Sequence, residues 1–267
     1  MPPGTVRYWS WLFAALDSRE PLLGVYALLA EWRALMDPDT ALAVAQVKLA
    51  WWREEMRRLA EGAPVHPISR YLASQPRSRA ADFAHLGKTV EAAAKHLAGA
   101  PLERGAQLET HSGALRANPL IVAARLASDR PDETEARMRG CVTALAAAEY
   151  LAGAIADYRR EARCGRTVFP IEELRAAGIK DADLVASVPP PRVQSYLEEL
   201  RRRAALFFTI AADALPRTER PRQRHLMVAA TLGARHLHSR DSALGTDFRL
   251  RDLYCAWTAA RRAARQG

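Results

Sequence analysis

Lysine is scarce in this chain, although basic residues are plentiful. Four of the 39 basic residues are lysine, which leaves 35 arginines, and the formal net charge is +9. Arginine presents a planar fork of donors that suits phosphate and carboxylate groups, so anionic partners such as diphosphates, acidic lipid surfaces or nucleic acid are predicted. A G+C-rich coding sequence, which favours arginine codons over lysine codons, explains the same ratio without any partner.

Cysteine and histidine are too sparse for most disulfide and zinc chemistry. Three cysteines, Cys141, Cys164 and Cys255, stand far apart and fit neither a disulfide framework nor a zinc spacing. His236 and His238 are two residues apart and would not share a helix face, which argues against a metal pair there. A reducing, cytoplasmic environment is therefore expected.

Long apolar runs are also missing. The most apolar stretch, "CVTALAAAEYLAGAIADY" (141–158), is rich in alanine and contains Glu149, so we predict that it falls short of a membrane span. The N-terminus lacks a charged start followed by an apolar run and a cleavage site. Peripheral membrane contact stays open, and one hypothesis is that the basic tail from Arg249 to Arg265 lies on an anionic membrane.

Alternating β-branched runs with turn dipeptides are absent, so no sheet is predicted. Asp37 is predicted to cap a helix that has Pro38 at its first position and ends at Gly62, and Pro119 is predicted to kink or divide another. The predicted helices cover 20–36, 37–62, 79–99, 103–127, 133–163, 192–215, 219–239 and 247–265. No long linker separates them, so the prediction is one all-α domain over residues 1–267.

The stretch "DYRREARCGRTVFP" (157–170) ends the longest predicted helix. Asp157 and Glu161 are four residues apart and share a face, where their repulsion is relieved either by a neighbour such as Arg160 or by Mg²⁺ carrying a diphosphate. Ion pairing on a solvated face is the simpler interpretation. However, the segment from Val142 to Ile155 carries few charges, which predicts a central helix that delivers both carboxylates to a cavity.

Two segments, "YLAGAIADYRREARCGRTVFPIEEL" and "VYALLAEWRALMD", carry a family resemblance. The first is similar to the second aspartate-rich segment of the squalene/phytoene synthase family, and the second is similar to the helix that carries that family's first aspartate-rich motif. "KLAWWREEMRRLAEGAPVHP" resembles the signature of its bacterial members, and "THSGALRANPLIVAARLAS" is a weaker likeness. The resemblance spans most of residues 8–240 and implies an isoprenoid-synthase-like helical barrel or bundle with a central cavity.

The resemblance implies head-to-head condensation of two prenyl diphosphates, held by Mg²⁺ between carboxylates on opposite walls. It implies an isoprenoid diphosphate or lipid ligand and Mg²⁺ as cofactor. The implied metal ligands are Asp157, Glu161 and Asp37. The substrate-binding residues that we predict are Tyr26, Arg33, Tyr150, Arg160 and Arg166.

The sequence departs from the family where the metal should bind. The paired aspartates of the first motif align with Arg33 and Ala34, which leaves Asp37, a residue that helix capping also explains. In the second motif Arg160 stands in place of one member of the acidic pair. A magnesium cluster needs several converging carboxylates, so metal-dependent condensation is predicted to be lost or weakened.

Two functions follow from this comparison. The first is a catalytically degenerate member that binds an isoprenoid or lipid and acts as an assembly-type factor; "YALLAEWRALMD" resembles the branch that includes a complex I assembly factor. The alternative is an active prenyl transferase that uses Asp157, Glu161, Glu31 and Asp37 as metal ligands. Nucleic-acid binding is not predicted, because the basic residues are spread over all the helices. The oligomeric state is left open.

Overall fold

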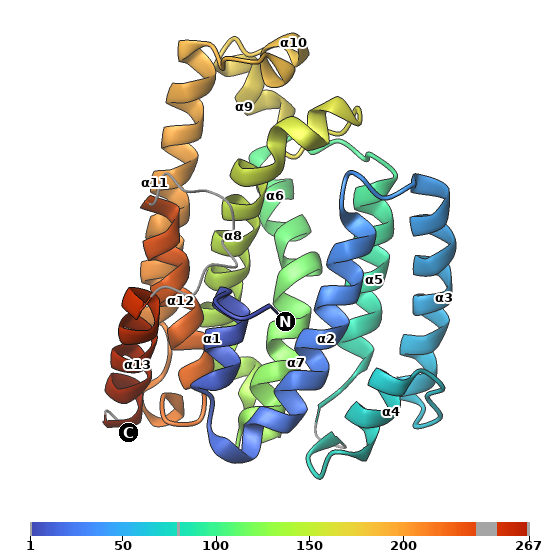
Figure 1. Cartoon of the computed structure of the whole chain (residues 1–267), viewed down its shortest axis with the longest axis vertical. Helices are drawn as coiled ribbons and strands as arrows, with labels where there is room; N and C mark the ends of the chain where they lie inside the picture. Colours follow the sequence, from blue (N-terminus) through green and yellow to red (C-terminus); the bar gives the residue numbers. More distant parts are fainter. Residues whose placement is uncertain (1, 79–80, 239–249, 266–267) are drawn as a thin grey trace.

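The computed structural model describes residues 2–78, 81–238 and 250–265, and these residues form helices and loops without a strand (Figure 1). The all-α prediction is thus confirmed. The α-helices are α1 (Val6–Leu12), α2 (Arg19–Met36), α3 (Leu42–Ala60), α4 (Pro67–Ser74), α5 (Ala84–Leu97), α6 (Gly105–Ser112), α7 (Asn118–Ala127), α8 (Pro131–Arg163), α9 (Ile171–Ala176), α10 (Asp181–Val185), α11 (Pro191–Asp213), α12 (Arg224–His238) and α13 (Leu250–Arg265). Short turns η1 (Leu16–Ser18), η3 (Gly113–Ala117) and η4 (Arg217–Glu219) join them.

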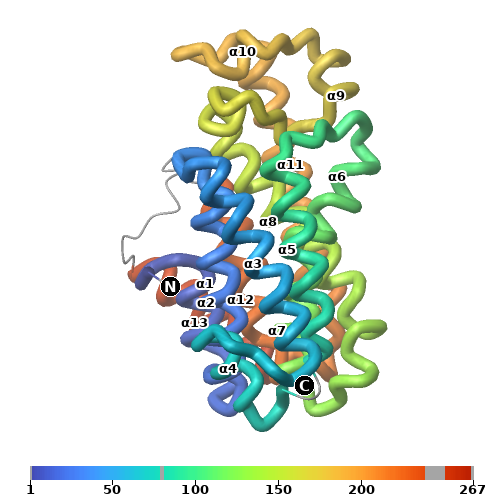
Figure 2. The backbone as a smooth tube through the Cα atoms, turned by 90° about the vertical axis from the view of Figure 1, so that its right-hand side faces the viewer, coloured from blue at the N-terminus to red at the C-terminus, as the bar shows by residue number. Residues whose placement is uncertain are grey.

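Helix α8 is the centre of the bundle. It packs against α7 and η3 on one side and against α11 and α12 on the other. Alanine is the most frequent residue on its buried face, with Leu145 and Leu151 fully enclosed, and these small side chains allow neighbouring helices to approach closely. Figures 1 and 2 show α9 and α10 gathered at one end of the bundle, beyond the C-terminal end of α8.

The same helix corrects a prediction about membrane spanning. By length and composition α8 is long and apolar enough to cross a membrane, which the sequence analysis had not expected. More than half of its most apolar window is buried against the other helices of the bundle. Its apolar character therefore has a sufficient cause in the packing of the core.

The prediction that Asp37 caps the helix expected over residues 37–62 is wrong. That helix, α3, begins at Leu42, and Asp37 instead terminates α2, with its N–H donating to the Ala34 carbonyl at 3.4 Å. The Asp37 carboxylate accepts the N–H of Asp39 at 2.9 Å, so it forms a local turn of the kind that aspartate favours before proline. The turn presents Asp37 and Asp39 beside the end of α8. Gly62 follows α3 with a φ of +80°, as expected for a helix-ending glycine.

The predicted helix 103–127 is divided one turn before Pro119. The π-helical turn η3 separates α6 from α7, and Pro119 lies in the first turn of α7. Proline has no N–H, and its ring crowds the carbonyl four residues earlier, so a wider turn relieves the strain. Asn118 donates its side-chain amide to the Ala114 carbonyl at 3.0 Å, which satisfies one acceptor within this turn.

Several boundaries differ from the sequence prediction. The helix predicted from 79 begins at Ala84 and the one predicted from 219 begins at Arg224, while residues 79–80, 239 and 247–249 lie outside the described residues. The short helices α1, α4, α9 and α10 were not predicted. Each has five to eight residues, too few for a periodic apolar pattern to stand out.

Close packing of α12 on α11 gives the first testable prediction. A Cβ added at Gly233 would lie 2.3 Å from Cε1 of the buried Phe208 ring, so Gly233→Ala is expected to destabilise the fold by about 1–3 kcal/mol. The matched control is Gly87→Ala in α5, where the nearest atom would be Met56 Cβ at 4.0 Å. That change is expected to add about 0.5–1 kcal/mol of stability. Urea unfolding of both variants measures the difference, and equal effects would contradict this packing.

Candidate functional site

A cavity of about 790 Å³ lies along the C-terminal half of α8, with further walls from α1, α2, α5, η3, α11 and α12. Part of its lining is apolar and includes Met36, Leu115, Ile155, Phe208 and Leu237. The remainder is strongly charged. The arginines are Arg7, Arg33, Arg116, Arg160, Arg201 and Arg202, and the carboxylates are Asp37, Glu149, Asp157, Glu161 and Glu198.

Arg160 is surrounded by three carboxylates at this cavity. Its Nη2 lies 2.6 Å from Asp37 Oδ1 and 2.7 Å from Asp39 Oδ2, and its Nη1 lies 3.6 Å from Asp157 Oδ1. The hydrogen bond to Asp39 is the largest of the effects that raise the pKa of Arg160. The guanidinium thus joins the turn after α2 to the end of α8, on opposite sides of the cavity. It holds together negative charges that would otherwise repel.

Glu161 is held by two other side chains, those of Arg166 and His96. It is buried, with Arg166 Nε 2.6 Å from Oε2 and His96 Nε2 3.8 Å from Oε1. Burial alone would raise the pKa of Glu161, but hydrogen bonds and charge from His96 and Arg166 lower it overall. Gly165, with a φ of +72°, turns the chain back after α8 and brings Arg166 onto Glu161.

Arg7 and Glu149 form a third charged pair that the sequence analysis missed. Arg7 Nη2 lies 2.5 Å from Glu149 Oε2, and its guanidinium sits over the Tyr26 ring at 5.3 Å. Tyr26 is buried beneath Arg7 and is not part of the cavity lining; burial raises its pKa to about 12. Tyr150 does line the cavity, and its hydroxyl donates to the Val168 carbonyl at 3.0 Å.

Arg33 and Arg116 line the cavity without an ion pair to any residue that the structure describes. The Nε of Arg116 is buried and has no hydrogen-bond partner within the same part of the chain. Burial lowers the pKa of Arg116; the nearby Glu149 opposes this effect, and the positive charges of Arg33 and Arg7 add to it. A buried donor without a partner is costly, so an anion that accepts from Arg116 would be favoured here.

The predicted metal ligands do not form a common cluster. Asp37 and Asp157 meet at Arg160, whereas Glu161 is held by Arg166 and His96. Within residues 2–78, 81–238 and 250–265, no group of three or more histidine, cysteine or acidic side chains is placed to hold a metal ion. Mg²⁺ prefers several oxygen ligands in octahedral geometry. Because arginine already occupies the space between the acids, this donor set does not fit a magnesium cluster.

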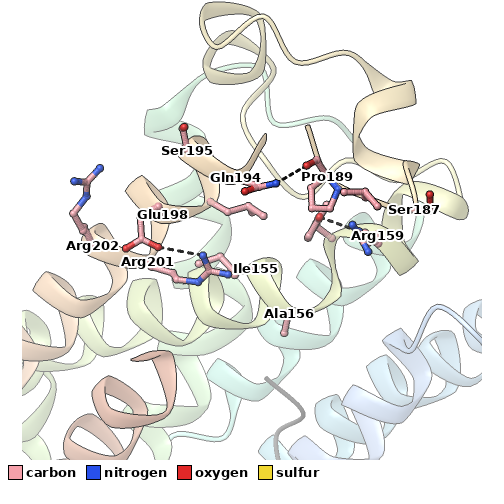
Figure 3. A pocket seen from close by; sticks show the side chains of 13 residues that line it. Ile155, Ala156, Arg159, Ser187, Pro189, Gln194, Ser195, Glu198, Arg201 and Arg202 are labelled. Atoms are coloured by element: carbon pink, nitrogen blue, oxygen red, sulfur yellow. Dashed lines mark hydrogen bonds and ion pairs between the residues drawn. The ribbon is translucent and has the colours of Figure 1, made fainter. Parts of the chain in front are cut away.

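A second hollow of about 870 Å³ adjoins the cavity between α8, α11 and the segment before α11 (Figure 3). The two hollows share Glu198, Arg201 and Arg202 on α11. Arg201 lies 3.3 Å from Glu198, and Gln194 donates to the Pro189 carbonyl at 2.7 Å. Arg159 borders this second hollow from α8, so the approach to the cavity is cationic as well.

Both the sequence and the fold of this chain are similar to those of known proteins. The family described as squalene/phytoene synthase matches residues 3–254. A dehydrosqualene synthase solved in complex with ligand is similar in structure, with a TM-score of 0.78 over 96% of this chain and 90% of that chain at 16% identity. The squalene synthase HpnC from Alicyclobacillus acidocaldarius has a TM-score of 0.68 over 86% and 85% at 19% identity. A search of curated proteins finds no match. The predicted isoprenoid-synthase-like fold is confirmed.

The position of Arg160 predicts that its loss would create a response to divalent ions. In Arg160→Ala, the carboxylates of Asp37, Asp39 and Asp157 lose their shared cation, and we expect a loss of about 1 kcal/mol that millimolar Mg²⁺ restores. The wild-type melting temperature should not respond to Mg²⁺. The control is Arg57→Ala, which also removes an arginine between two acids, but here the acids Glu54 and Glu61 lie on α3 and directly after its end. Thermal melts in Mg²⁺ and in EDTA measure this response. A melting temperature of Arg160→Ala that does not change with Mg²⁺ would contradict the interpretation.

The buried position of His111 leads us to predict that the folded protein loses stability in mild acid. Burial, followed by the charges of His96 and Arg116, lowers the pKa of His111 to about 4. Between the ordinary histidine pKa and this value only the unfolded chain takes up the proton, so stability falls as the pH drops. At pH 5 the contribution is on the order of 2 kcal/mol relative to pH 7. His111→Gln should lose less stability than wild type between pH 7 and pH 5 in urea unfolding. Parallel curves would refute the assignment.

Proposed function

The chain belongs to the squalene/phytoene synthase family, and we propose that it is a member that binds an isoprenoid diphosphate or a related anionic lipid without ionising it. The family binds isoprenoid diphosphates and typically depends on Mg²⁺. This chain keeps the cavity of the family, but arginine side chains take the place of a metal ion in binding the anionic head group of the ligand. Its role is that of a binding protein and not of a transferase.

The observation that carries the proposal is Arg160 among Asp37, Asp39 and Asp157. The family resemblance puts an acidic residue at position 160, where it would help to bind a divalent ion. Here the side chain brings its own positive charge and forms hydrogen bonds at 2.6 and 2.7 Å with acids from the facing wall. Departure of a diphosphate needs concentrated positive charge on the leaving group. A guanidinium that is neutralised by three carboxylates supplies little of it.

Arg33 and Arg116 supply the attraction for the anionic head group. Neither is paired with a described acid, and the buried Nε of Arg116 lacks a partner among the described residues. Guanidinium groups bind phosphate oxygens directly through charge-assisted hydrogen bonds, so no metal is needed as an intermediary. Arg33 also stands where the resemblance places an aspartate of the first motif, and this exchange reverses the charge at that wall.

The apolar part of the same cavity suits the hydrocarbon portion of such a ligand. Met36, Leu115, Phe208 and Leu237 line it, and a volume of about 790 Å³ is in the range of small-molecule sites. Burying an isoprenoid chain here would gain roughly 25 cal/mol for each Å² of apolar surface removed from water. The hydrocarbon chain of the ligand would therefore add affinity to that which its head group gains from Arg33 and Arg116.

We extend the proposal to an assembly-type role in the cytoplasm. Its support is the likeness of "YALLAEWRALMD" (26–37) to the branch that includes a complex I assembly factor, together with the metal-poor site. In such a role the ligand-bound chain is the active species, and a partner protein recognises it. The ligand-binding experiment below stands independently of the partner.

The proposal predicts metal-independent binding. Titration calorimetry with a non-hydrolysable farnesyl or geranylgeranyl thiodiphosphate should give the same affinity in EDTA and in Mg²⁺. Arg33→Gln and Arg116→Gln should each weaken binding about tenfold or more, since a hydrogen bond to a charged group contributes about 1.5–3 kcal/mol. The matched control is Arg192→Gln, which removes an arginine paired with Asp183 away from the cavity and should leave affinity unchanged.

Turnover provides the decisive contrast. Incubation with farnesyl or geranylgeranyl diphosphate and Mg²⁺ or Mn²⁺ should release no diphosphate. Strictly metal-dependent tight binding, or diphosphate release that Asp157→Asn abolishes, would instead support an active prenyl transferase and overturn the proposal.

A further inference from the structure

Helix α13 presents a surface that the cavity does not account for. It packs against α12 and α1 through a face of small residues, among them Ala256, Ala259, Ala260 and Ala263. It lies at the edge of the bundle in Figure 1. The opposite face carries Leu250, Tyr254, Trp257, Arg261 and Arg265 at helical spacing, and all five are exposed.

Aromatic and cationic groups are combined on this face. The rings of Tyr254 and Trp257 are 6.1 Å apart, and the Arg261 guanidinium lies 5.0 Å from the Trp257 ring centre. Arg251 and Arg262 flank this line and are also exposed. Large apolar side chains at exposed positions lose stabilisation that burial would give them, so such a set indicates a surface that becomes covered.

The acidic residue of α13 is turned away from this surface. Asp252 is 2% exposed and accepts hydrogen bonds from Arg235 Nε and His236 Nε2, both at 3.0 Å. None of Arg251, Arg261, Arg262 and Arg265 forms an ion pair with a described residue. The outer face of α13 is therefore cationic, and no acid among the described residues compensates it.

From these contacts we propose that the outer face of α13 docks on an anionic lipid bilayer. Tryptophan and tyrosine favour the head-group region of a bilayer, and arginine beside them pairs with lipid phosphates while its stem stays among apolar groups. The charge on the face selects an acidic membrane, since each basic residue near such a surface adds attraction. The proposal stands on α13 alone and does not rest on the proposed ligand of the cavity.

Helix α3 offers a comparison within the same chain. It exposes Val44, Val47 and Trp51, and Trp51 is 43% exposed against 42% for Trp257. However, Arg57 and Arg58 of α3 are paired with Glu54 of the same helix and with Glu61, the residue that follows it. Lys48 and Arg53 of α3 form no ion pair with a described residue, against four such arginines on α13. Helix α3 thus combines a similar apolar exposure with less available positive charge, and it serves as the comparison surface.

Vesicle flotation of the full chain tests the proposal. Vesicles of phosphatidylcholine with about 30% phosphatidylglycerol should bind the protein, and vesicles of phosphatidylcholine alone should bind it far less. The double change Arg261→Glu with Arg262→Glu, and separately Tyr254→Ala with Trp257→Ala, should each reduce the bound fraction about tenfold or more. Trp51→Ala should bind as wild type does. Circular dichroism melts confirm that the variants are folded.

Five outcomes would overturn the proposal. These are equal binding to neutral and acidic vesicles, an equal loss in Trp51→Ala, binding that survives both α13 double changes, or a chain that instead forms dimers or binds duplex DNA through α13. Light scattering after size exclusion, and a salt titration with duplex DNA, detect the last two. Quenching of Trp257 fluorescence by brominated lipid, absent in Trp257→Phe, locates the contact in the positive case.

Discussion

The guanidinium of Arg160 is the contact on which the site depends. Three carboxylates from two sides of the cavity converge on one side chain, with the two shorter distances at 2.6 and 2.7 Å. A fixed cation at this place neutralises the acids without leaving them free to coordinate an exchangeable ion. It also ties the turn after α2 to the end of α8. Arginine at position 160, in place of the acidic residue that the family resemblance puts there, therefore changes both the charge at this part of the cavity and the connection between the cavity walls.

The rest of the cavity follows the same rule. Glu161 is neutralised by Arg166, with His96 also in contact, and Glu149 is neutralised by Arg7. After these pairings Arg33 and Arg116 remain without a described acidic partner, so the available charge is positive. A cavity that needed to concentrate metal ions would have the opposite balance. Positive charge that comes from the chain itself attracts anions at any divalent ion concentration.

The long helices were predictable because their signals are local. Proline in a first turn, glycine after a last turn and the apolar period place α2, α8 and α11 to within a few residues. The start of α3 was not predictable in this way, because the turn at Asp37 is completed by Arg160, 123 residues further along the chain. Short helices gave too few residues for a period. The packing of Arg7 on Glu149 spans 142 residues and left no local trace.

The site residues show the same limit. Asp157, Glu161 and Arg160 were found from their spacing and from the family resemblance, and Arg160 was expected as a neighbour that relieves Asp157. The partners that come from other parts of the chain, Asp37, Asp39, Arg166 and His96, were not predicted. Spacing puts Asp157 and Glu161 on one helix face, whereas their charges are balanced by different cations. Arg116 was missed although it follows an apolar turn in "SGALRANP", where a lone arginine in a buried segment is itself a signal. Whether the named residues bind metal or substrate remains a prediction.

The buried carboxylate of Asp252 reaches across from α13 to His236, and His236 forms part of the cavity wall on α12. The side chain of Asp252 thus connects α13, at the edge of the bundle, to a residue that lines the cavity. Any displacement of α13 must break or carry along this hydrogen bond. By thermodynamic reciprocity, an event on the outer surface and occupancy of the interior would then each alter the free energy of the other by the same amount.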